Sequence, residues 1–120
     1  MIRKAAFFSY LILITLLSLW PSDDLPDIEL FPHADKIIHI GMYAGFTFLM
    51  FWTWREKLKG IKQFLPLLIV LVWGLLMELL QQSTGFGRSS DYMDILANCL
   101  GFIPGWLAWK LCERMQLSRK

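Results

Sequence analysis

Apolar residues along the 120-residue chain gather in four long runs separated by shorter polar connections. The runs are Ala5–Trp20, Ile37–Trp54, Gln63–Met77 and Ile95–Trp109. Each run has 15 to 18 residues, close to the ~20 that a helix needs to cross a hydrocarbon core ~30 Å thick. The pattern predicts an all-α, single-domain polytopic membrane protein, a bundle of four transmembrane helices at about 5–22, 35–55, 63–82 and 93–112.

The composition strengthens this interpretation. Apolar residues make up 56% of the chain and charged residues 18%, against about 45–50% and about 25% in typical soluble domains. Five of the six Trp residues lie at the ends of runs, where aromatic residues meet the membrane interface. The chain has no basic stretch interleaved with aromatic residues, so we expect no nucleic-acid partner and assign the lipid bilayer as its surroundings.

Basic residues divide unequally between the connections. Ten of the twelve Lys and Arg residues fall on the side of the termini and the second connection, and only Lys36 and Arg88 on the other. The positive-inside rule therefore predicts a multi-pass membrane protein with both termini and the second connection in the cytoplasm. The first run could also be a secretory signal, but Ser18-Leu19-Trp20-Pro21 lacks a small-x-small cleavage pattern, so we expect its retention.

Polar side chains recur at helical spacing in the outward-facing halves of the last three runs. Asp35, His39 and Tyr43 are each four residues apart, so they share one face of a helix. Polar groups within a bilayer usually face the protein interior or water, which predicts one polar pocket open to the outside. The residues expected to bind a ligand there are Asp35, Lys36, His39, Tyr43, Glu78, Gln81, Arg88, Asp91, Asp94 and Asn98.

This ordered set resembles the VanZ-like family of small integral membrane proteins over about residues 35–105. The matching positions run Asp35-Lys36-x-x-His39-x-x-x-Tyr43, Glu78-x-x-Gln81, Arg88-x-x-Asp91-x-x-Asp94 and Asn98-x-x-Gly101, followed by Gly105. The resemblance implies a bacterial cell-envelope protein of the cytoplasmic (inner) membrane, without an agreed biochemical activity. The founding member is associated with teicoplanin resistance, which implies a role in the response to glycopeptide antibiotics.

Glycines also recur at four-residue spacing on two of the expected helices. Gly41 pairs with Gly45, and Gly101 pairs with Gly105. Small residues at this spacing allow helix backbones to approach closely. We expect these glycines to pack helices within the chain in preference to forming a dimer interface, and the oligomeric state stays open.

The polar residues allow several kinds of chemistry. Asp35 and His39 could form an acid–base pair, and Glu78 and Asp94 are further catalytic candidates. Arg88 could clamp an anionic group of a substrate, but acids outnumber bases around it, so a counter-ion role is favoured. Carboxylates also suit a divalent cation. No tight ligand motif such as H-x-x-x-H is present, however, so we expect no metal site, and the question of a cofactor stays open.

Two functions of different classes follow. The first is a binding protein whose outward pocket recognises a polar head group or a cell-wall precursor. The second is a small membrane-embedded enzyme performing acid–base or metal-assisted chemistry on a lipid-linked substrate of the outer leaflet. Charge-neutral substitutions at Asp94 and Glu78 would separate them, because an enzyme should lose its activity whereas a recognition protein should stay folded and partly functional.

Overall fold

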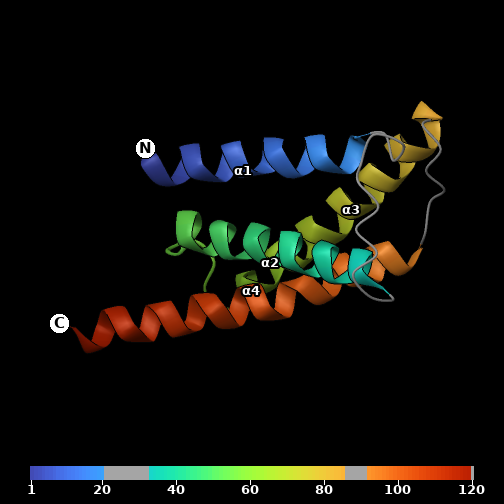
Figure 1. Ribbon diagram of the computed structural model, residues 1–120. Coiled ribbons are helices and arrows are strands. Elements are labelled where there is room, and N and C mark those ends of the chain that lie inside the picture. The colour runs from blue at the N-terminus through green and yellow to red at the C-terminus, as the bar shows by residue number, and fades with distance from the viewer. Residues whose placement is uncertain (21–32, 86–91, 120) are drawn as a thin grey trace.

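The computed structural model describes residues 1–20, 33–85 and 92–119 and forms a bundle of long helices (Figure 1). They are α1 (Ile2–Leu19), α2 (Ala34–Trp54), α3 (Leu65–Thr84) and α4 (Tyr92–Ser118), with a short 3-10 helix, η2 (Gly60–Phe64), before α3. No strand occurs in these described ranges. All four long helices are long and apolar enough to cross a membrane. The predicted all-α fold with four membrane-length helices is confirmed.

The outer surface of the bundle is apolar. Many large apolar side chains are exposed there. Leu16 of α1, for example, is 56% exposed, and Leu79 of α3 is 61% exposed. Such an extended apolar surface would drive aggregation in water. In a bilayer it contacts acyl chains, which agrees with the high apolar content of the chain.

Local signals explain where two helices begin or end. Pro66 lies in the first turn of α3, where its missing N–H removes no helical hydrogen bond. Gly85 ends α3 in the left-handed region, with φ of 64°. Helix α4 continues past the expected end at residue 112, because polar helix-forming residues follow its apolar run and Lys110 pairs with Glu113 at 3.3 Å.

Helix α2 lies at the centre of the bundle and contacts each of the other three long helices, whereas α1 and α4 do not touch in the described parts of the chain. Helices α2 and α4 run in the same direction, opposite to α1 and α3 (Figure 1). The first turns of α2 and α4 therefore lie at one end of the bundle. The N-terminus of α1 and the C-terminus of α4 lie at the other end.

Two glycines of α4 bring its backbone against α2. A Cβ added at Gly101 would lie 2.6 Å from the backbone oxygen of Ile40. A Cβ added at Gly105 would collide with the backbone oxygen of Ala44 and lie 2.8 Å from Cβ of Thr47. Neither backbone oxygen can move aside cheaply, so the α2–α4 contact requires glycine at both positions.

The glycine pair of α2 behaves differently at its two positions. A Cβ added at Gly45 would collide with the hydroxyl of Tyr10, so this glycine accommodates α1. A Cβ added at Gly41 would meet nothing within 4 Å. The close packing expected at Gly41 is therefore not found, because this position of α2 faces neither α1 nor α4.

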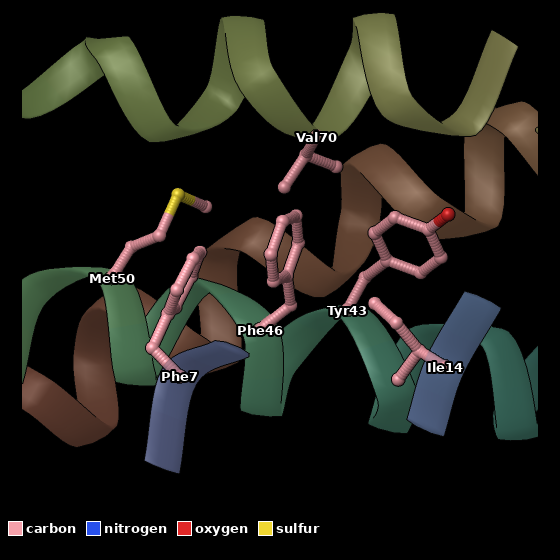
Figure 2. Packing of buried hydrophobic residues seen from close by; sticks show 6 residues of the cluster. All are labelled: Phe7, Ile14, Tyr43, Phe46, Met50 and Val70. Carbon is pink, nitrogen blue, oxygen red and sulfur yellow. The ribbon is translucent and has the colours of Figure 1, made fainter. Parts of the chain in front are cut away.

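Buried apolar side chains from α1, α2 and α3 form the main core, with Tyr43, Phe46 and Met50 of α2 at its centre (Figure 2). Phe7 of α1 stacks on Phe46 with ring centroids 5.5 Å apart. Val70 of α3 is fully buried against the same cluster. A second cluster joins α2 to α4 through Phe51, Phe102 and Trp109.

Polar contacts attach α1 to α2 at two levels. The Tyr10 hydroxyl donates to the backbone oxygen of Met42 at 2.8 Å. Near the N-terminus, the guanidinium of Arg3 lies 5.5 Å from the ring centre of Trp52, and the Thr53 hydroxyl donates to the Arg3 backbone oxygen at 3.2 Å. These contacts hold a helix that buries few of its own side chains.

Candidate functional site

An ion pair joins the first turns of α2 and α4. The ammonium of Lys36 contacts Oδ1 of Asp94 and lies 3.0 Å from Oδ2 of Asp35. The side chains of Lys36 and Asp94 are only 19% and 17% exposed, whereas that of Asp35 is 63% exposed. Both acids lie in a first helical turn, where the helix dipole favours negative charge. Lys36 thus links the two helices through Asp94, with Asp35 on the exposed side.

One turn further along α2, the His39 ring contacts two side chains of α4. Its Nδ1 lies 2.9 Å from Oδ1 of Asn98, and its Nε2 lies 3.9 Å from Oδ2 of Asp94. Asp94 and Asn98 are four residues apart, so they present both groups on one face of α4. We name Lys36, His39, Asp94 and Asn98 the α2–α4 polar cluster. Its side chains supply charged, acceptor and donor groups at one end of the bundle.

Helix α3 approaches this cluster through Gly74. A Cβ at that position would lie 2.9 Å from Nδ2 of Asn98, so only glycine leaves room for the amide. Glu78 follows Gly74 by one helical turn and shares its face of α3. Glu78 is only 4% exposed. Its carboxylate lies close enough to Tyr43 of α2 to interact with it electrostatically. Glu78 is therefore directed into the bundle and not toward lipid.

Two residues expected to bind a ligand make structural contacts. The amide of Gln81 donates from Nε2 to the backbone oxygen of Ser18 at 2.5 Å, which ties α3 to the end of α1. Tyr43 is 1% exposed, and its ring packs in the main core beside Phe46 and Ile14 (Figure 2). Their contacts direct Gln81 toward α1 and Tyr43 into the core.

Arg88 and Asp91 lie outside the described residues. Of the ten residues expected to form the pocket, four form the α2–α4 polar cluster and Asp35 adjoins it through Lys36. Glu78 lies on the face of α3 that turns toward this cluster. The structure thus brings these polar groups together at one end of the bundle, and the outward-facing ligand pocket expected there stays a prediction.

A family model described as VanZ/LLP1 matches residues 3–113. The chain belongs to the VanZ-like family. The match covers α1 as well as the region 35–105 on which the sequence resemblance rested, so that resemblance is confirmed over nearly the whole chain. No curated protein and no solved structure matches this VanZ-like protein.

The described residues of this VanZ-like protein contain no group of three or more His, Cys, Asp or Glu side chains arranged to hold a metal ion. Lys36 occupies the position between Asp35 and Asp94 that a cation would take. The ammonium thus supplies the positive charge that these two carboxylates require.

Three residues that shape the site escaped the sequence pattern. Gly74 makes room for Asn98, and the Ser18 backbone oxygen accepts the hydrogen bond of Gln81. The Tyr10 hydroxyl donates a hydrogen bond to the backbone of α2. A signal existed for two of them: Gly74 precedes Glu78 by four residues, and Tyr10 is a hydrogen-bonding side chain in the middle of an apolar run. Ser18 bonds through its backbone oxygen, which carries no sequence signal.

Proposed function

We propose that this VanZ-like protein binds the polar head group of an envelope lipid or lipid-linked cell-wall precursor through the α2–α4 polar cluster. The observation that carries the proposal is the convergence of Lys36, His39, Asp94 and Asn98 from two parallel helices. Ionisable groups inside a membrane are expensive, and where they occur they usually mark a functional site. The side chains of Lys36, His39 and Asp94 are 16–19% exposed, which leaves them accessible from the end of the bundle, whereas Asn98 is buried beneath them.

The chemistry of the cluster indicates the kind of head group. Asp35, Asp94 and Glu78 are acidic, and Lys36 already pairs with two of these acids. Carboxylate and amide groups hydrogen-bond hydroxyl, amine and amide groups. A head group rich in hydroxyl and amide groups, as in a sugar–peptide precursor, fits these side chains better than a bare phosphate.

The orientation is part of the proposal. Lys57, Lys59 and Lys62 lie in the connection at the end opposite the cluster. The positive-inside rule assigns that end, with both chain termini, to the cytoplasm of a bacterium. The cluster then faces the outer leaflet, where cell-wall precursors and glycopeptides such as teicoplanin meet. A reporter active only in the cytoplasm, fused after residue 120, would be active if this orientation holds and inactive if it is reversed.

One observation favours an enzyme as the second candidate. His39 lies between the Asn98 amide and the Asp94 carboxylate, an arrangement in which the amide orients the ring and its other nitrogen faces a carboxylate. The acid–base pair of such an enzyme would be His39 with Asp94, across two helices. The pair expected from the sequence was His39 with Asp35.

Two measurements on one set of variants distinguish the candidates. Native-lipid preparations of the wild type, Asp94→Asn and Glu78→Gln are analysed by mass spectrometry for bound lipids, and cells expressing them are tested for teicoplanin susceptibility. Glu113→Gln is the matched control, because it makes the same chemical change as Glu78→Gln at a carboxylate of α4 outside the α2–α4 polar cluster. A binding protein gives weaker retention of a glycosylated or peptide-bearing lipid in Asp94→Asn. A chemically altered lipid that appears only with the wild type supports the enzyme, and identical lipid profiles in every variant would refute both.

A further inference from the structure

A wide groove lies at the end of the bundle opposite the α2–α4 polar cluster. It has a volume of about 1590 Å³ and runs between α1, α2 and α3, under the connection from α2 to α3. Pockets for drug-sized ligands have volumes of about 300–1,000 Å³, so this groove suits a larger molecule.

The walls of the groove are apolar. Phe7 and Leu11 of α1, Met50 and Trp54 of α2, and Ile69 of α3 line it. Residues at its edge are open to the surroundings of the bundle: Phe8 is 51% exposed and Leu68 is 55% exposed. The groove therefore offers hydrocarbon a place between the helices with access from the side.

The mouth of the groove is basic. Lys57, Lys59 and Lys62 line it at the connection before α3. Lys59 pairs with Glu56 at 2.7 Å, whereas neither Lys57 nor Lys62 forms an ion pair within the described parts of the chain. The Lys59 ammonium also lowers the pKa of the exposed Glu56 carboxyl, so this acid is ionised at neutral pH and offsets one lysine. Two uncompensated ammonium groups remain above an apolar groove.

The depth of the groove identifies its occupant. On α3 its lining residues extend from Leu65 to Trp73, which is about 12 Å along the helix. On α1 the lining residues run only from Phe7 to Leu11, and on α2 they begin at Phe46, so neither helix lines the groove over more than about half of its length. A partner helix would need a groove over the full core of ~30 Å, whereas the acyl chains of one leaflet need only half of it.

We propose that this groove holds the acyl chains of an anionic phospholipid, with the lipid phosphate beside Lys57 and Lys62. Basic pockets between transmembrane helices bind anionic head groups in this way. The site lies at the opposite end from the α2–α4 polar cluster and does not depend on the ligand or chemistry proposed there. It holds in either orientation of the protein, because both the lysines and the groove belong to the same end.

The test is native mass spectrometry of the purified full chain with phosphatidylglycerol or with phosphatidylcholine. The wild type should bind phosphatidylglycerol more tightly, and Lys57→Gln with Lys62→Gln should weaken that binding about thirtyfold, without changing the binding of phosphatidylcholine. Lys110→Gln with Arg114→Gln is the matched control, because it removes the same charge from α4, outside the groove. Glu56→Gln should tighten the binding of phosphatidylglycerol.

A second pair of variants tests the hydrocarbon part of the site. Ile69→Trp fills the groove and should reduce the binding of both lipids. Leu79→Trp is the control and should not reduce it, because Leu79 is 61% exposed and lies on α3 outside the groove. Melting temperatures measured in the same detergent identify any variant that fails to fold. If one pair of variants contains such a protein, either the lysine pair or the Trp pair, the other pair decides the test. Equal affinity of the wild type for the two phospholipids, or an equal loss in the lysine variant and its α4 control, overturns the proposal. Unchanged lipid binding in a folded Ile69→Trp protein also overturns it.

Discussion

Nδ1 of His39 lies 2.9 Å from the side-chain oxygen of Asn98, a residue 59 positions later in the chain. An amide oxygen only accepts, so Nδ1 carries the proton in this hydrogen bond. The other ring nitrogen, Nε2, is then directed toward Asp94 at 3.9 Å. Asn98 therefore fixes both the orientation and the tautomer of the only described histidine within a membrane-length helix.

Replacing Asn98 with Ala should destabilise the protein by about 1 kcal/mol, because it leaves the His39 N–H without its acceptor in a partly buried site. Unfolding in mixed detergent measures this loss. Leu96→Ala is the control, since Leu96 is on the same helix but 52% exposed to lipid. If the two variants unfold alike, the His39–Asn98 hydrogen bond contributes nothing to stability.

Exchanging the charges of Lys36 and Asp94 tests their ion pair. Either Lys36→Asp or Asp94→Lys alone should cost about 2 kcal/mol, less than the ~3–5 kcal/mol of a fully buried pair because both side chains are about one-fifth exposed. The double exchange should recover at least half of that loss. Additive destabilisation in the double variant would show that the two residues act independently.

Gly105 and Gly41 should respond in opposite directions to the same substitution. Gly105→Ala should destabilise the protein by about 2 kcal/mol, because the added methyl group meets the backbone of α2. Gly41→Ala should be neutral or stabilise it by about 0.5–1 kcal/mol, because the site is open and Ala favours a helix. Equal thermal shifts in the two variants would contradict the close α2–α4 contact.

The effect of Gly45→Ala should depend on Tyr10. In the wild-type background the methyl group displaces the Tyr10 hydroxyl and breaks its hydrogen bond to Met42, at a cost of about 1 kcal/mol. In a Tyr10→Ala background the obstacle is absent, so Gly45→Ala should cost almost nothing. A full thermodynamic cycle measures this coupling, and strict additivity would rule out the contact between α1 and α2 at this level.

Hydropathy predicted the four helices because the length of an apolar run is a local property of the chain. It missed the end of α4, since the residues from Lys110 onward are polar and their helix is continued by propensity and local ion pairing. It also carried no information on the pairing of α2 with α4. These helices are not consecutive, and their contact depends on which face Gly101 and Gly105 present.

The candidate site was predictable in part for the same reason. Spacing of four residues placed Asp94 with Asn98 on one face of α4, which is a local property. The residue that each side chain contacts is far away in the sequence, so spacing does not predict it. Gln81 donates a hydrogen bond to the backbone of α1, and Tyr43 packs in the main core. Gly41 and Gly101 have the same four-residue repeat, yet only Gly101 meets another backbone, because the repeat defines a face and not its neighbour.

The parallel pairing of α2 with α4 also constrains how the chain is made. Lys36 and Asp94 are 58 residues apart in the sequence. At a ribosomal rate of about 5–20 residues per second, Lys36 of α2 is therefore synthesised about 3–12 seconds before Asp94 of α4. During that interval Lys36 and His39 of α2 lack their partners Asp94 and Asn98, and the cost of isolated polar groups in hydrocarbon favours keeping this face beside the protein-conducting channel or in interfacial water. We therefore expect assembly of this bundle to follow the pace of translation, with α2 entering the lipid once α4 has emerged.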